Sequence, residues 1–321
     1  MIDIIIPTYN NPQGLRNTLQ SIPTQYLDQL VVTVIDDGSS TPYTQVVTDF
    51  PFINFTVQEN QGPGIARQIG IETTYEPYIM FIDTGDYFLQ NVFPTILTTV
   101  AAFPTVNIFG WKFRYGENKL SNHTANHLHG RVYKRKFLDD HNIKFCFEKE
   151  ASYSNEDIGF NYACRLVSQN YPNSFYFDDE PILMYNTNDS NSLTNKNNRE
   201  FIYNTQNISF AQNAINAYNI AVKNNVPPDV LAVFVANNIQ SLYYWYLRTV
   251  LDRPQFTQNA FNGALYYYKH LYATLPKPPT ASTAAVATRL QSHYQDNAWT
   301  TRVTLNIKQF VKELERKAKY E

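Results

Sequence analysis

The chain has 321 residues, of which 43% are hydrophobic and 17% are charged, with 24 Tyr and 21 Phe. This composition is enough to build a large buried core and excludes an intrinsically disordered chain. The net charge of −2 does not indicate a strongly charged partner such as nucleic acid.

The first third of the sequence alternates between apolar runs and helical patterns. Strands that alternate with helices of roughly ten residues are typical of an α/β fold with a doubly wound, mostly parallel, Rossmann-like sheet. The strands are predicted at residues 2–6, 31–35, 53–57, 78–82 and 106–113, and the helices at about 15–23, 42–49, 65–74 and 92–102.

The alternation loosens after residue 114. The next elements are predicted to be a strand at 129–133, helices at 136–141 and 155–168, and short strands at 175–177 and 182–185. The Asn-rich segment 186–198 is a candidate lid over the sheet edge, with an ordinary polar loop as the alternative. His123 and His127 are expected to be loop residues.

From about residue 200 the pattern is helical. Helices are predicted from an Asp229 cap to beyond residue 245, over 256–275, and over an amphipathic stretch at 299–319. The tyrosine-rich runs 243–246 and 266–268 point all round their helices, so we expect them mainly to pack.

Charge also divides the chain near residue 200. Residues 1–199 carry 14 Lys and Arg against 21 Asp and Glu, a net −7, whereas residues 200–321 carry 12 against 7, a net +5. We therefore predict an α/β domain over residues 1–200 and an all-helical C-terminal domain over residues 201–321. The helical domain is expected to serve acceptor binding or oligomerisation.

The cysteine content and the lengths of the apolar runs bear on the compartment. Two cysteines, Cys146 and Cys164, make no disulfide framework, so we expect a reducing, cytoplasmic setting. No apolar run reaches the length of a transmembrane segment, so any membrane contact is expected to be peripheral.

Polar residues follow three of the predicted strands: Pro7-Thr8-Tyr9, Asp36-Asp37-Gly38 and Asp83-Thr84-Gly85-Asp86. The carboxyl ends of parallel strands meet at one edge of a sheet, where open α/β folds bind ligands. An ionised Asp at such an edge accepts the imide N–H of uracil or thymine, which adenine and cytosine lack. An ordinary Asp-Gly turn is the alternative at both acidic motifs.

Asp83 and Asp86 are the candidate metal ligands. Two carboxylates together with diphosphate oxygens suit Mn²⁺ or Mg²⁺. His129 is a further candidate, because the strand that it leads should return to the same edge; a structural role is the alternative. Arg67 follows the Gly-rich turn at Gly62 and suits a diphosphate, or else it pairs with an acid such as Glu72.

Five of these elements, in this order and spacing, resemble the family 2 glycosyltransferases of the GT-A fold, over roughly residues 1–195. The residues that carry the resemblance are Ile4 to Asn10, Val34 to Ser39, Asn60-x-Gly62 with Ala66-Arg67 and Gly70, Phe81-Ile82-Asp83-x-x-Asp86, and Asn155-Glu156-Asp157. The remaining C-terminal residues are not covered.

The resemblance implies an inverting transferase that uses a UDP-sugar or dTDP-sugar. In the family the second Asp, here Asp37, reads the base, and Asp157 is the general base, with Glu156 before it contacting the acceptor. Asp86 matches the acid that most often touches the metal, and Asp83 the one that contacts the ribose or orients the site. The implied nucleotide-sugar site comprises Pro7, Thr8, Tyr9, Asp36, Asp37, Asn60, Gly62, Arg67, Asp83 and Thr84.

Two features of these motifs bear on whether the residues bind a metal and act in catalysis. Gly85 stands where the family usually has a middle acid, which lowers the number of metal ligands. Acids such as Glu156 and Asp157 in a first helical turn also stabilise the helix dipole, which is an alternative to catalysis.

Other activities and acceptors remain open. A sugar-phosphate nucleotidyltransferase is disfavoured because Pro7 to Asn11 contains no Gly or Lys. A non-catalytic sugar-nucleotide or glycan-binding protein stays open because of Gly85. The expected acceptor is a glycan or anionic polymer, such as cell-envelope polysaccharide or teichoic acid. The alternative is a nucleic acid acceptor, as in phage-type glycosyltransferases that act on hydroxymethylated DNA bases.

Overall fold

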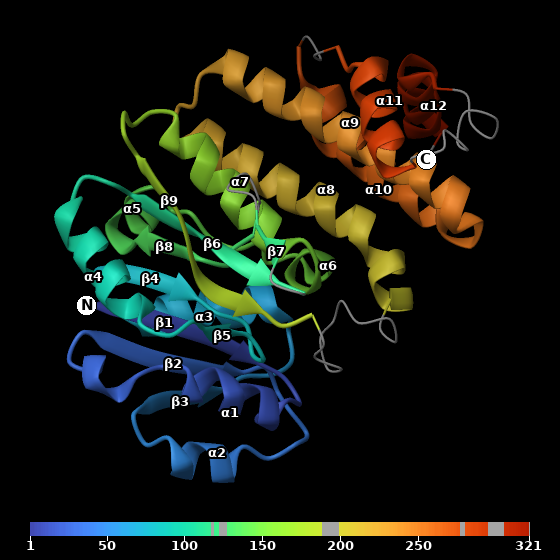
Figure 1. Ribbon diagram of the computed structural model, residues 1–321. Helices are drawn as coiled ribbons and strands as arrows, with labels where there is room; N and C mark the ends of the chain where they lie inside the picture. The colour runs from blue at the N-terminus through green and yellow to red at the C-terminus, as the bar shows by residue number, and fades with distance from the viewer. Residues whose placement is uncertain (117–118, 122–126, 188–198, 277–279, 295–304, 321) are drawn as a thin grey trace.

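The computed structural model describes residues 1–116, 119–121, 127–187, 199–276, 280–294 and 305–320. A nine-stranded mixed sheet lies at the centre of the fold (Figure 1). Its first half consists of four parallel strands in the spatial order β3-β2-β1-β4: β3 (Ile53–Val57), β2 (Leu30–Asp36), β1 (Ile2–Thr8) and β4 (Tyr78–Phe81). The predicted α/β fold with its parallel sheet is confirmed.

The second half of the sheet is mixed and continues β8-β6-β9-β5, with β7 paired to β6. The strands are β5 (Tyr87–Phe88), β6 (Ile108–Tyr115), β7 (Lys119–Leu120), β8 (Arg131–Lys134) and β9 (Phe175–Tyr185). Two predictions need correction here. The two short strands expected at 175–177 and 182–185 form one strand, β9. The strand expected at 129–133 begins at Arg131, so His129 lies in the turn before it.

Strand register explains why the polar motifs meet. Thr8 of β1 pairs with Asp36 of β2, which pairs in turn with Val57 of β3. The residues that follow these strands therefore emerge together at the carboxyl edge.

Helices cover both faces of the sheet because strand side chains alternate between them. Ile4 and Ile6 of β1 belong to the apolar cluster that includes Leu15 and Ile96, whereas Ile5 belongs to the cluster on the other face. The first face is covered by α1 (Pro12–Gln20), α2 (Thr44–Asp49) and α4 (Val92–Ala102), and the second by α3 (Pro63–Thr73), α5 (Arg135–Asp140) and α7 (Glu156–Ser168). Between α5 and α7 lies the short helix α6 (Lys149–Tyr153).

The C-terminal region is helical, as predicted. Its helices are α8 (Arg199–Lys223), α9 (Pro228–Asp252), α10 (Thr257–His270), α11 (Thr283–His293) and α12 (Ile307–Tyr320). Asp229 lies within the first turn of α9 rather than at its cap, which is Pro227. Tyr243, Tyr244 and Tyr267 are buried in the core of this region, which confirms the packing role expected of the tyrosine-rich runs.

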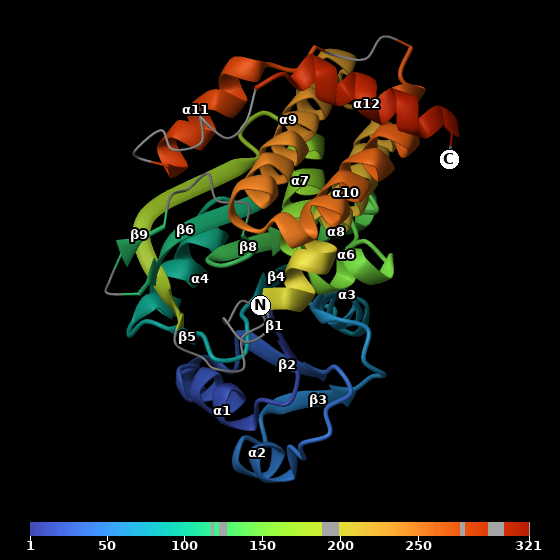
Figure 2. The same cartoon turned by 90° about the vertical axis from the view of Figure 1, so that its right-hand side faces the viewer.

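Helix α8 contacts both parts of the chain. Its residues Ala217 and Ile220 join the apolar cluster of the α/β part, whereas Ala211 and Ala214 join the cluster of the C-terminal helices. Helix α8 runs alongside α7, which it contacts, and α9–α12 lie further from the sheet (Figure 1). Figure 2 shows these C-terminal helices at the opposite end of the molecule from α1 and α2. The split at residue 200 stays a prediction, and α8 is the helix that connects the two sides of it.

Two predictions, for His123 and for the proposed lid, concern residues that the structure does not describe. His123 and residues 188–198 of the proposed lid lie outside the described ranges. Within those ranges, no helix combines the length and the apolar character needed to cross a bilayer.

Candidate active site

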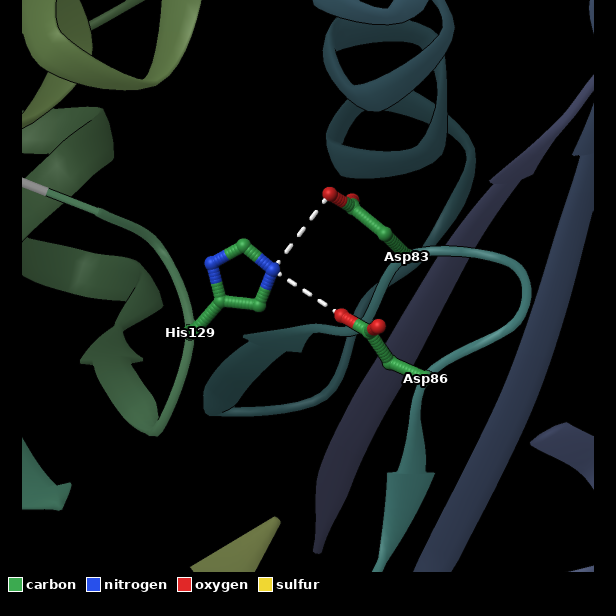
Figure 3. A group of neighbouring side chains, drawn as sticks. All are labelled: Asp83, Asp86 and His129. Atoms are coloured by element: carbon green, nitrogen blue, oxygen red, sulfur yellow. Dashed lines mark ion pairs between the residues drawn. The ribbon is translucent and has the colours of Figure 1, made fainter. Parts of the chain in front are cut away.

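Three side chains converge beyond the end of β4 (Figure 3). The Nε2 atom of His129 lies 3.0 Å from an Asp86 carboxylate oxygen and 3.5 Å from an Asp83 carboxylate oxygen. One ligand atom from each residue lies within 4.8 Å of the others. The sequence prediction that His129 approaches the two acids is met by this geometry.

The three side chains fit a divalent metal. His129 Nε2 and Asp86 Oδ2 are both buried, and neither forms a hydrogen bond with any described residue, although they are 3.0 Å apart. When His129 is neutral and Nε2 carries no proton, a lone pair on Nε2 and one on Asp86 Oδ2 face each other across this distance. A cation between them would satisfy both, with Asp83 as the third ligand.

The turn that carries the acids is held by neighbouring elements. The Thr18 hydroxyl of α1 accepts a hydrogen bond from Gly85 N (2.9 Å) and donates to Asp86 O (2.7 Å). The backbone N–H of Asn186 donates to Asp86 Oδ1 at 2.8 Å. Gly85 has φ +101°, where an L-residue is strained, so this turn conformation disfavours an acid at that position.

Charge is balanced inside the site. Burial lowers the pKa of His129, but its contacts with Asp83 and Asp86 outweigh this and raise the pKa to about 10. Burial acts to raise the pKa of Asp83, yet the Arg67 guanidinium and His129 hold it well below its usual range. Burial raises the pKa of Asp86. The imidazolium of His129 therefore supplies the positive charge that a metal would replace.

Arg67 joins this group to the acids of α7. Its Nη2 lies 2.5 Å from Asp83 Oδ1, and its Nη1 lies 2.8 Å from Glu156 Oε1. Arg67 is 3% exposed. The guanidinium is thus a buried bridge between two acids, neither of which is Glu72. Its predicted contact with a diphosphate stays a prediction.

Asp157 lies on the more open side of the same turn. Its Oδ1 accepts a hydrogen bond from Ile158 N at 2.8 Å, and its Oδ2 lies 3.2 Å from His127 Nδ1. The side chain of Asp157 is 23% exposed, so an acceptor hydroxyl could reach it. His127 is a loop residue, as predicted. The only sequence feature that could have indicated its contact with Asp157 is the spacing of His127 and His129, two residues apart.

Asp37 holds the loop between β3 and α3. Its carboxylate is buried and accepts hydrogen bonds from Gln58 Nε2 (2.7 Å), Gln61 N (2.8 Å) and Gly62 N (2.9 Å). The loop passes so close to α6 that a Cβ at Gly62 would lie 2.9 Å from Ser152 O. The Ser152 hydroxyl also accepts from Ile65 N at 3.0 Å, so a side chain of α6 occupies part of the α3 N-terminus.

The other predicted nucleotide-site residues lie along the same edge. Thr84 Oγ1 donates to Pro7 O at 2.8 Å, and Thr8 Oγ1 lies 2.8 Å from the Tyr43 hydroxyl. Tyr9 is half exposed. The structure therefore brings the Pro7-Thr8-Tyr9 motif next to the acid turn.

Two contacts complete the edge beside Asp37. Asp36 accepts from the Ser39 hydroxyl at 2.5 Å. The Asn60 side chain donates to Asp37 O at 2.9 Å and accepts from the Tyr153 hydroxyl. The sequence did not identify Tyr153, because α6 is too short to show helical periodicity.

The chain is similar to known proteins in sequence and in fold. Residues 3–159 match the family model described as "Glycosyl transferase family 2". A minor teichoic acid biosynthesis protein, GgaA of Bacillus subtilis, is 30% identical over 136 residues, covering 39% of this chain and 30% of that protein. The glycosyltransferase GlyA of Streptococcus pneumoniae is 26% identical over 146 residues, covering 44% of this chain and 21% of that protein. The matches thus span less than a third of either relative.

Solved structures share the fold at low sequence identity. The structure of S. aureus TarS aligns with a TM-score of 0.63 and 14% identity, covering 92% of this chain and 53% of TarS. The mannosyltransferase PcManGT of Pyrobaculum calidifontis, solved with GDP-Man and Mn²⁺, aligns with a TM-score of 0.51 and 16% identity, covering 99% of this chain and 86% of that one.

Proposed function

The chain belongs to glycosyltransferase family 2 through residues 3–159 and has the GT-A fold, and on that premise we propose that it transfers a sugar from a UDP-sugar or dTDP-sugar to an acceptor hydroxyl, with inversion. The observation that carries the proposal is the Arg67 bridge. It joins Asp83 of the candidate metal group to Glu156 of the acid pair. Donor and acceptor chemistry would then meet at one sheet edge.

The nucleotide is proposed to lie along the edge from Asp37 to Asp83. A carboxylate offers about four acceptor positions, and Asp37 uses three of them for the loop at Gln58–Gly62. The remaining position is assigned to the base imide N–H, with Tyr9 against the base. Asp36, Asn60 and Thr84 fix the backbone around it, and Asp83 orients the sugar side.

Asp83, Asp86 and His129 are proposed to hold the metal. Mg²⁺ takes oxygen ligands almost exclusively, so the imidazole favours Mn²⁺, although Mg²⁺ remains the alternative. A divalent cation held there would stabilise the negative charge that develops on the departing nucleoside diphosphate.

Asp157 is proposed to act as the general base. As the acceptor oxygen bonds to the anomeric carbon, the bond from that carbon to the diphosphate oxygen breaks and the acceptor proton passes to Asp157. The contacts with Ile158 N and His127 keep the carboxylate oriented. Glu156 is held by Arg67 at the acceptor side.

The acceptor is proposed to be a glycan or an anionic polymer. The name of the B. subtilis relative refers to teichoic acid biosynthesis, and residues 200–321 carry 12 basic against 7 acidic residues, a net +5. A basic surface attracts an anionic polymer. The same charge leaves DNA as the second candidate, and salt-sensitive binding to duplex DNA measured beside a polyol-phosphate polymer would separate the two.

A donor panel tests the proposal. UDP-GlcNAc, UDP-glucose, dTDP-glucose and GDP-mannose would be compared by thermal shift and by release of nucleoside diphosphate, with Mn²⁺ and with EDTA. We expect a uridine or thymidine donor to stabilise the protein and to be turned over only with metal. Binding without release would favour the non-catalytic alternative, and a preference for GDP-mannose would refute the base assignment.

The base is tested with Asp157→Asn. We expect donor binding to be kept and turnover to fall by about 100-fold or more. Asp229→Asn is the matched control, because Asp229 also lies in the first turn of a helix but far along the chain on α9. If both variants lose the same activity, helix stabilisation rather than base catalysis explains Asp157.

A further inference from the structure

Helix α8 presents a polar stripe to the turn that carries the acid pair. Gln206, Ser209, Asn213 and Asn216 recur at steps of three and four, which places them on one face of the helix. Ser209 and Asn213 are 0% and 1% exposed. Buried polar groups in such a stripe need specific partners, and these partners lie in residues 144–155.

Asn155 is the first of these partners. It precedes Glu156 with φ +56°, in the left-handed region. An Asn at a helix start usually caps its own helix, but this side chain makes no such bond. Its Nδ2 instead donates to Gln206 O (3.0 Å) and Ser209 Oγ (2.7 Å) on α8.

Asn213 contacts the same turn from the other side. Its Nδ2 donates to Ala151 O (3.0 Å), in the middle of α6, and to Ser154 O (3.2 Å), in the residue before Asn155. Its side chain also lies against Gly159, where an added Cβ would come 2.5 Å from Asn213 Oδ1. Helix α8 therefore contacts the chain both before Glu156 and after Asp157.

We propose that Asn155 and Asn213 are positioning residues for the proposed glycosyl transfer, because through α8 they fix the orientation of Glu156 and Asp157. The inference rests on the proposed role of Asp157 as base. Directional hydrogen bonds fix a turn to one geometry, whereas apolar contacts between α7 and α8 alone would allow it to shift. The first C-terminal helix is thereby part of the catalytic apparatus.

The decisive variant is Asn155→Gly. Glycine adopts positive φ without strain, so the backbone conformation is kept while both bonds to α8 are lost. We expect turnover of the panel's preferred donor with Mn²⁺ to fall by about 10- to 100-fold, with the KM for the donor and the Kd for UDP unchanged. Wild-type turnover in this variant would overturn the role of Asn155.

Asn213→Asp tests the second residue with little change in volume. The substitution replaces the amide N–H₂ donor by a carboxylate oxygen, which cannot donate to the Ala151 and Ser154 carbonyls. We expect kcat to fall by as much as in Asn155→Gly. Asn216→Ala is the matched control: Asn216 belongs to the same stripe but donates to Lys144 O at 3.3 Å, away from the acid turn. If Asn216→Ala loses as much kcat as Asn213→Asp, the stripe serves only folding and the proposal fails.

A readout without catalysis separates this inference from the proposed function. The ¹⁵N shifts of the His127 imidazole report the position of Asp157, which lies 3.2 Å away. We expect these shifts to change in Asn155→Gly and not in Asn216→Ala. A wild-type chain that releases no nucleoside diphosphate from any donor would refute the proposed function, while unchanged shifts in Asn155→Gly would refute the positioning role.

Discussion

The guanidinium of Arg67 forms a 2.8 Å ion pair with Glu156, a residue 89 positions further along the chain. Because Arg67 also pairs with Asp83, one buried cation connects the β4 acid turn to the first turn of α7. Removing one partner of a buried pair leaves an uncompensated charge, which costs far more than losing an exposed pair.

Arg67→Met should therefore destabilise the protein by about 3–5 kcal/mol, measured by urea denaturation. Arg67→Lys should recover part of this loss, because an ammonium reaches one of the two acids. Arg16→Met is the control, since the Arg16–Asp49 pair has a similar length, 2.6 Å, but side chains that are 27% and 34% exposed, so its loss should cost much less. Equal losses in Arg67→Met and Arg16→Met would contradict the burial argument.

Glu156 should make the stability depend on pH. Burial raises its pKa to about 7 against the opposing effect of Arg67, whereas the unfolded value is about 4.3. Between these values the native state holds a proton that the unfolded state has released, so the free energy of unfolding falls as the pH rises. The fall should approach about 4 kcal/mol, at about 1.4 kcal/mol per pKa unit.

The measurement compares urea unfolding of the wild type and Glu156→Gln from pH 4.5 to pH 8, in EDTA. Glutamine does not titrate, so Glu156→Gln should lack the contribution of Glu156 to the pH dependence. The free energy of unfolding of the wild type minus that of Glu156→Gln should therefore fall as the pH rises. Glu313→Gln, at an exposed acid paired with Arg316 on α12, serves as the control and should track the wild type. A wild-type profile parallel to that of Glu156→Gln would show that Glu156 is ionised throughout.

The sequence predicted the acids of the site because they end buried strands. A continuous apolar run into Asp83 and Asp86 indicates both the strand and its carboxyl edge. His129 followed from the expectation that its strand returns to that edge. The contacts of Arg67 with Glu156 and of His127 with Asp157 could not be predicted, since they depend on how α7 docks against the sheet.

The fold was predictable where periodicity extends over several residues. β5 and β7 have two residues each, and α6 has five, which is too short for an apolar pattern to appear. β9 was divided in the prediction because its centre, Asp178 to Pro181, is polar. Its pairing with β6 shifts register at that point, so the strand continues through a local irregularity that the sequence pattern does not encode.

Asp37→Asn should change nucleotide preference. The wild-type carboxylate suits the imide N–H of uracil, whereas an amide N–H₂ can donate to cytosine N3. We expect UDP affinity to fall by about tenfold and the ratio of UDP to CDP affinity to fall further, measured by calorimetry with Mn²⁺. Asp36→Asn, at a buried acid held by Ser39, should leave that ratio unchanged. An unaltered ratio in Asp37→Asn would mean that Asp37 only supports its loop.

His129→Gln should weaken metal binding. The buried Nε2 of His129 has no hydrogen-bond partner among the described residues and faces Asp86 at 3.0 Å, so its loss would remove one of the three proposed ligands. We expect the Kd for Mn²⁺, measured by electron paramagnetic resonance, to rise by at least about tenfold, and the thermal stabilisation by Mn²⁺ to shrink accordingly. His141→Gln, at a histidine that bonds Asn224 just after the end of α8, should bind Mn²⁺ as the wild type does. If His129→Gln binds Mn²⁺ with wild-type affinity, His129 is not a metal ligand, and only Asp83 and Asp86 remain as proposed ligands.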